Sequence, residues 1–166
     1  MHRPASAMAS GLTVAREPSA GDGPRWVVAQ AEAELVVRYG GLDDGERGLT
    51  AAMFDPPAGV FVVGRAGSAG PPVGGVGLRA VGPGVGEVRR LWVDPDWRGQ
   101  GVARRLMAAL EDAARGLGLS GLRLATGERQ PEAVALYTAT GWERVHLDAD
   151  GGPLPVCHIR FAKQLV

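Results

Sequence analysis

Apolar residues recur every three or four positions in several stretches of the chain, which is the spacing of a helix that buries one side. The clearest stretch is residues 100–117, where Val102 and Leu106 begin a series of apolar positions with charged side chains between them. The same pattern predicts helices over residues 25–39 and 130–141. The last of these opens with a proline and closes with a glycine, the residues that commonly start and end helices.

Shorter segments rich in β-branched residues, bounded by glycine or proline, predict strands. These segments are residues 11–17, 60–66, 71–81, 86–93, 122–126, 142–147 and 156–162. In the middle of the chain three strands follow one another directly, whereas strands and helices alternate after residue 95. This order predicts an α/β (α+β) domain with a mixed central sheet of about six or seven strands, flanked by helices. We place this single domain at residues 11–166 and expect residues 1–10 to be disordered.

Composition narrows the classes of function. The chain has 166 residues, 45% of them hydrophobic, which is enough for one domain with a sizeable core. Its 18 Lys and Arg balance 18 Asp and Glu, so no general field attracts nucleic acid or an anionic membrane. No apolar run approaches the ~20 residues that span a bilayer, and residues 1–10 lack the apolar core of a secretory signal. We therefore expect a cytoplasmic protein.

The residues that ligate metals or form disulfides are scarce. Cys157 is the single cysteine, so the chain has no internal disulfide, and its three histidines are scattered. We expect no metal site. Cys157 is interpreted as a strand residue, and neighbouring His158 would point to the opposite face of that strand.

A glycine-rich segment before the helix of residues 100–117 predicts a site for phosphate. Residues 98–103 read Arg-Gly-Gln-Gly-Val-Ala and lie between an expected strand and that helix, where free N–H groups bind anions and glycine lets them approach. Arg98 and Arg104 add positive charge. The alternative is an ordinary helix start without a ligand.

Two other phosphate-binding motifs do not fit their surroundings. The chain contains no Gly-Lys-Ser/Thr, which a P-loop requires. Residues 75–80 match the letters of the dinucleotide motif G-x-G-x-x-A, but they lie inside an expected strand and no helix follows. A nucleotide hydrolase and a dinucleotide-binding protein are therefore disfavoured.

Residues 98–103 resemble the R/Q-x-x-G-x-G/A pyrophosphate loop of the GNAT superfamily, the acyl-CoA-dependent N-acyltransferases. Residues 86–118 look like the whole strand–loop–helix unit of that family. Residues 130–142, "QPEAVALYTATGW", resemble its N-x-x-A-x-x-L-Y-x-x-x-G-[FYW] segment, with Gln130 where asparagine is usual. The resemblance extends over residues 59–146. It implies a GNAT fold in which a splayed pair of strands holds coenzyme A, with acetyl-CoA as co-substrate and no metal.

The resemblance also implies which residues contact coenzyme A. The backbone of one strand would pair with the pantetheine arm, the loop and first helical turn would hold the pyrophosphate, and the second motif would reach the arm. The expected contacts are Leu91, Trp92, Val93, Arg98, Gly99, Gln100, Gly101, Val102, Ala103, Arg104, Gln130 and Tyr137. The longer side chain of Gln130 leaves open whether it contacts the arm directly.

Acetyl transfer needs an oxyanion site, a general acid and a route for the amine proton. By resemblance, a main-chain N–H near Val93 stabilises the oxyanion and Tyr137 protonates the leaving thiolate. The alternative for Tyr137 is packing of its helix on the sheet. Glu87 matches an acidic position that serves as general base in many relatives. Alternatively, Glu87 is only a solvated residue at the start of a strand, and a water chain takes the role of general base.

These expectations lead to an N-acetyltransferase that moves the acetyl group of acetyl-CoA directly to a primary amine of a small molecule. Two alternatives stay open: a non-catalytic acyl-CoA-binding or sensing module, and an enzyme that acetylates protein or peptide amines. We expect no nucleic-acid or membrane partner, and a homodimer is the expected assembly if the chain follows its relatives.

In the family the acceptor pocket is built by variable segments, here residues 25–57 and 148–155. Acidic side chains in these segments would attract a cationic amine. They are Asp43, Asp44, Glu46, Asp148 and Asp150.

Overall fold

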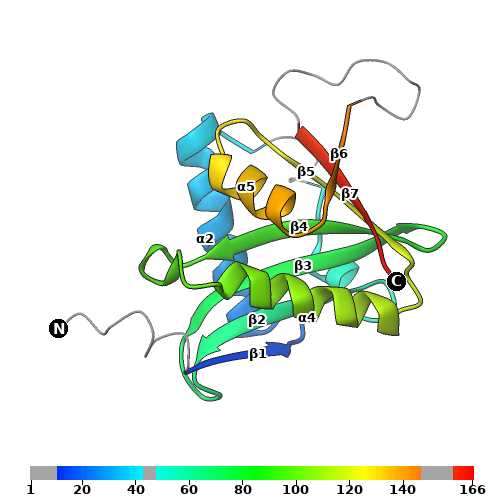
Figure 1. The fold of residues 1–166 in the computed structure, drawn as a ribbon. Coiled ribbons are helices and arrows are strands. Elements are labelled where there is room, and N and C mark those ends of the chain that lie inside the picture. Colours follow the sequence, from blue (N-terminus) through cyan, green and yellow to red (C-terminus); the bar gives the residue numbers. More distant parts are fainter. Residues whose placement is uncertain (1–10, 43–47, 147–158) are drawn as a thin grey trace.

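The strands form one seven-stranded sheet with helices on both faces (Figure 1), and two of its central strands are therefore buried along most of their length. The computed structural model describes residues 11–42, 48–146 and 159–166. Its strands are β1 (Leu12–Arg16), β2 (Gly59–Ala66), β3 (Pro72–Gly82), β4 (Val85–Val93), β5 (Gly121–Thr126), β6 (Glu143–Val145) and β7 (Ile159–Gln164). They lie in the order β1-β2-β3-β4-β5-β7-β6, and only β4 and β5 pair in parallel. The predicted mixed sheet and α/β class are confirmed.

Helices cover the two faces of this sheet. They are α2 (Asp22–Tyr39), α4 (Val102–Gly116) and α5 (Pro131–Ala139), with short 3-10 helices η1 (Ala51–Phe54) and η2 (Pro95–Trp97). In one hydrophobic cluster Leu106 of α4 and Tyr137 of α5 pack with Val76. In a second cluster Val27 of α2 packs with η1 and Phe61. Thus α4 and α5 lie on one face, and α2 and η1 on the other (Figure 1).

A β-bulge interrupts β4 and changes the face to which its side chains point. Gly75 of β3 pairs with Trp92 and Gly77 pairs with Arg89, so two residues of β4 stand opposite one residue of β3. Arg90, in the bulge, has a φ of 61°, which is rare for a residue with a side chain. After the bulge Trp92 faces α2, although Val88 four residues earlier belongs to the cluster beneath α4.

Strands β4 and β5 pair only at their beginning and then separate. The parallel register covers Val85 with Gly121, Gly86 with Leu122 and Glu87 with Arg123, whereas β4 continues to Val93. The splayed strand pair expected from the resemblance is therefore present.

The boundaries of several elements differ from the predictions. Helix α2 begins at Asp22, three residues before the predicted start, because Pro24 fits the first turn of a helix. Helix α4 begins at Val102 instead of residue 100, because Gly101 has a φ of 80° and lies outside the helix. The predicted strand of residues 142–147 is shortened to β6. Residues 1–10, expected to be disordered, and Cys157 and His158 lie outside the described residues.

Candidate active site

The glycine-rich loop presents main-chain groups at the start of α4. Gly99 and Gly101 have φ angles of 75° and 80°, a conformation that residues with side chains rarely adopt. A Cβ atom at either position would have no described protein atom within 4 Å, so the space beside the loop is open. Gly101 caps α4 without a side-chain hydrogen bond, which leaves the first N–H groups of the helix for an anion. This geometry fits a pyrophosphate group.

The arginines of this loop have different surroundings. Arg98 donates from Nε to the carbonyl oxygen of Val93 at 2.8 Å and from Nη2 to Oε1 of Glu34 at 2.8 Å. Its side chain is thus held between the end of β4 and α2. Arg104 is exposed on the first turn of α4. Gln100 donates from Nε2 to the carbonyl oxygen of Asp96 at 3.2 Å, which closes the loop on itself.

A cavity of about 110 Å³ lies where β4 and β5 separate, between α2 and α5. Its lining brings together Leu91, Trp92, Gln130 and Tyr137, four of the residues predicted to contact coenzyme A. Residues 124–126 of β5 form the opposite side. The lining also includes Arg89, which belongs to neither coenzyme A motif of the sequence. An extended ligand in this cavity would lie along the unpaired edges of both strands.

Tyr137 is buried in α5, with 5% of its surface exposed. Its ring lies 5.6 Å from the rings of both Trp142 and Phe161. It therefore packs its helix on the sheet, and it also lines the cavity, so the two roles considered for it are compatible. Burial raises the pKa of Tyr137, so its hydroxyl keeps its proton at neutral pH.

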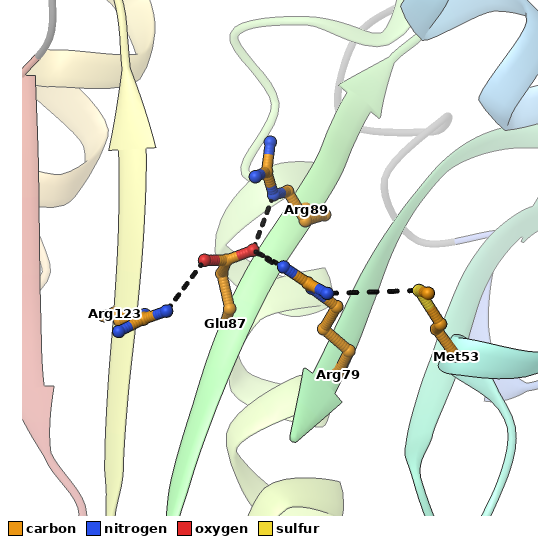
Figure 2. A network of polar contacts seen from close by, with 5 residues as sticks. All are labelled: Met53, Arg79, Glu87, Arg89 and Arg123. Carbon is orange, nitrogen blue, oxygen red and sulfur yellow. Dashed lines mark hydrogen bonds and ion pairs between the residues drawn. The ribbon is translucent and has the colours of Figure 1, made fainter. Parts of the chain in front are cut away.

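Glu87 is enclosed by arginines (Figure 2). Its Oε1 accepts hydrogen bonds from Nε and Nη2 of Arg79 at 3.1 and 3.0 Å and from Nε of Arg89 at 2.8 Å. Nη2 of Arg123 approaches its Oε2 at 3.4 Å. Burial acts to raise the pKa of Glu87, but the hydrogen bonds and positive charge of Arg89 and Arg79 outweigh burial and lower it. A carboxylate held this way is a weak proton acceptor, which favours the water-chain alternative.

Gln130 stands just before the first residue of α5 and lines the cavity. Its Nε2 donates to the hydroxyl of Tyr39 at 3.4 Å. The ring of Tyr39 lies against Gly127, where a Cβ atom would collide with the hydroxyl. Tyr39 was missed in the sequence because nothing in the pattern of α2 places its last residue beside the end of β5.

Reciprocal contacts connect the end of α2 to the segment before α5. Nη1 of Arg38 donates to the carbonyl oxygen of Arg129 at 2.8 Å, and Nη1 of Arg129 donates to that of Arg38 at 2.9 Å. Arg38 also pairs with Glu132 at 2.5 Å, and with Glu34 at 3.8 Å. Through Glu34 this network continues to Arg98, so one series of ion pairs extends from the glycine-rich loop to α5.

The residues that the structure describes include no group of three or more His, Cys, Asp or Glu side chains placed to hold a metal ion. No helix among them is long and apolar enough to cross a membrane. The acidic residues expected to attract the acceptor lie outside the described part of the chain. They are Asp43, Asp44, Glu46, Asp148 and Asp150.

Strands β4 and β5 separate beside an uncapped helix that follows a glycine, an arrangement that suits an extended, phosphate-bearing ligand. The chain belongs to the acetyltransferase (GNAT) family, whose sequence model matches residues 25–142.

Among curated proteins, the chain is 46% identical over 70 residues to an IAA acetyltransferase of Azospirillum brasilense. It is 40% identical over 83 residues to the N-alpha-acetyltransferase RimI of Mycobacterium tuberculosis. These matches cover 42% and 48% of this chain, and the chain spans only 42% and 51% of the relatives' own lengths.

Solved structures show the same fold over nearly the whole chain. A putative acyl-CoA N-acyltransferase from Klebsiella pneumoniae is 27% identical with a TM-score of 0.74, covering 93% of this chain and 98% of its own. A GNAT family acetyltransferase from Elizabethkingia anophelis, solved with acetyl-CoA bound, is 16% identical with a TM-score of 0.64. That match covers 94% of this chain and 99% of the other.

Proposed function

We propose that this chain is an acetyl-CoA-dependent N-acetyltransferase that acts on a primary amine of a small molecule. The observation that carries the proposal is the separation of β4 from β5 beside the uncapped start of α4, with Tyr137 in the cavity between the strands. Family membership supports an acyltransferase, and a structural neighbour holds acetyl-CoA. The balanced charge of the chain supports an enzyme without nucleic-acid or membrane partners.

The chain offers two kinds of contact for the co-substrate. The N–H groups at Gly101 and the first turn of α4 would hold the pyrophosphate, with Arg104 beside them. The unpaired backbone edge of residues 91–93 would bind the pantetheine arm as an added strand does. Gln130 lines the cavity and would supply a polar contact to the ligand, with the hydroxyl of Tyr39 as its partner.

Acetyl-CoA supplies an acetyl group activated as a thioester, and the chain supplies the groups around it. Main-chain N–H donors of residues 91–93 would stabilise the negative charge that develops on the thioester oxygen. Tyr137 would donate its proton to the departing thiolate. Because burial raises the pKa of Tyr137 and a thiol has a pKa of about 8.5, this transfer proceeds only if the tyrosine is rapidly reprotonated by the proton that the amine releases.

The amine must lose a proton before it attacks. Glu87 is ionised at neutral pH and lies among arginines, so we assign this proton to water in the cavity instead of to Glu87. In this proposal Glu87 positions the arginines around it.

A protein N-terminus is the second candidate acceptor, and the 40% identity to an N-alpha-acetyltransferase favours it. A turnover assay with a peptide amine and with small amines separates the two. A module that binds acyl-CoA without turnover is the third candidate. A loss of acetylation rate in Tyr137→Phe would exclude it, because a module without turnover has no such rate to lose.

Calorimetric titration with acetyl-CoA, with NAD and ATP as controls, tests the proposal first. We expect binding of acetyl-CoA alone, weakened at least about tenfold by Gly101→Glu, which places a carboxylate where the pyrophosphate would lie. Tyr137→Phe keeps the ring that lines the cavity and removes only the hydroxyl, so it is expected to change this binding little and to lower kcat about 10²-fold or more. Failure to bind acetyl-CoA would refute the proposal, and full activity of Tyr137→Phe would refute the role of Tyr137.

A further inference from the structure

Three arginines gather around Glu87 on the face of the sheet that α2 and η1 cover. We call Arg79 of β3, Arg89 of β4 and Arg123 of β5 the arginine cluster. Figure 2 shows their guanidinium groups converging on one carboxylate from three neighbouring strands. All three guanidinium groups contact the carboxylate of Glu87, at 2.8 to 3.4 Å.

The cluster has donors that Glu87 does not use. Arg79 places two nitrogens on Glu87 and its third, Nη1, 3.9 Å from Sδ of Met53. A thioether sulfur is a weak acceptor, so an anionic oxygen would be a better partner for this nitrogen. The side chain of Arg123 is 56% exposed and makes the longest contact with Glu87. These two arginines therefore have the capacity to bind a further anion.

The cluster lies at the closed end of the splayed strands. Glu87 and Arg123 form the last pair that joins β4 to β5. Arg89, two residues further along β4, lines the cavity. A strand rises about 3.3 Å per residue, so Arg89 is separated by only ~7 Å of strand from Leu91, where the site proposed for the pantetheine arm begins. A small molecule can span this distance.

We propose that the acceptor is a small amine that also carries a carboxylate, and that the arginine cluster binds this carboxylate while the amine points toward the thioester. This inference rests on the proposed acetyltransferase function and specifies its substrate class. Glu87 acts as a positioning residue that holds the three guanidinium groups in place. The cluster is built on paired strands and held by Glu87, so binding of the carboxylate does not require a loop to become ordered first.

The test compares acids with their neutral isosteres. The probes are glycine, β-alanine, 4-aminobutanoate and phenylalanine, each paired with its primary amide, and the release of coenzyme A is followed with a thiol reagent. We expect kcat/KM for at least one acid to exceed that of its amide about tenfold or more, because charge-assisted hydrogen bonds to a carboxylate are lost in the amide. Equal use of acids and amides, or no acetylation of any acid in the panel, would overturn the inference.

Variants separate carboxylate binding from a merely structural role. Arg79→Gln and Arg123→Gln should each raise KM for the preferred acid about 10- to 100-fold, with a smaller change in kcat, and should move the acid-to-amide ratio toward one. Arg115→Gln, at a surface arginine on α4 paired with Asp112, should leave that ratio unchanged. A ratio that is the same in all variants would overturn the inference.

The same preparations distinguish this inference from the proposed function. If acetyl-CoA binds and an amide or a peptide amine is acetylated as well as the acids, only the carboxylate preference fails. If acetyl-CoA does not bind, the proposed function fails and the substrate class fails with it.

Discussion

Replacing Glu87 with glutamine should destabilise the fold, because it leaves three guanidinium groups around a neutral amide. The side chain of Glu87 is 13% exposed, whereas those of Arg79, Arg89 and Arg123 are 27%, 23% and 56% exposed. Each hydrogen bond to a charged group contributes about 1.5–3 kcal/mol to stability. Solvent screens the partly exposed arginines, so the total contribution of their hydrogen bonds to Glu87 is smaller than the sum of the separate values. We expect a loss of about 2 kcal/mol in the free energy of unfolding. For a chain of this size that lowers Tm by about 4–8 °C.

The loss of stability in Glu87→Gln should become smaller as the pH falls. The folded protein holds the pKa of Glu87 below its usual value. A carboxylate with a lowered pKa contributes its full stabilisation above its unfolded pKa of about 4.3, and loses it as the pH falls through the lower folded value. The difference in Tm between the parent protein and Glu87→Gln should therefore be constant near neutral pH and decrease below about pH 4.

Thermal unfolding followed by circular dichroism, at several pH values, measures both quantities. The matched control is Asp112→Asn, which removes a carboxylate that is 78% exposed and lies 2.9 Å from Arg115. We expect the control to change stability by less than about 0.5 kcal/mol. An unchanged Tm for Glu87→Gln at neutral pH, or a difference that grows on acidification, would refute the reasoning.

Two further changes probe the loop and the core. Glu34→Gln should tighten acetyl-CoA binding up to about fivefold. Glu34 lies 2.8 Å from Arg98 and would compete with the pyrophosphate for this arginine. Weaker binding of acetyl-CoA to the variant in calorimetry would contradict this expectation. Gly59→Ala should cost about 2 kcal/mol or more in urea unfolding, because its Cβ atom would collide with the backbone oxygen of Leu78. The control Gly82→Ala meets no described atom within 4 Å and should be neutral, so equal effects would show that the collision is not the cause.

Local patterns predicted the order of elements because each helix and strand here carries its own periodicity and end signals. Residues 100–117 show this most clearly, since α4 buries Leu106 and Leu110 completely. The two adjacent arginines of "VRRLWV" already break the alternation of β4, and the structure places a bulge there. The splay of β4 from β5, in contrast, came from the family resemblance.

The arginine cluster could not be predicted from local patterns. Arg123 is 36 residues from Glu87 in the sequence, and their contact depends on a parallel register that no local signal specifies. Arg98 and Glu34 are 64 residues apart and meet only because α2 crosses the end of β4. Side-chain roles that depend on such long-range pairs require the structure.

The separation of β4 from β5 also bears on how the protein behaves in storage. Beyond Glu87 and Arg123, two strands turn unpaired backbone edges toward each other inside the molecule, where edges are normally paired. Unpaired edges pair readily with extended segments of other molecules. The contacts between α2 and the segment before α5 lie close to these edges. A ligand that bonds to these edges acts as a missing strand. If acetyl-CoA binds along these edges as proposed, it should therefore slow aggregation of the purified protein.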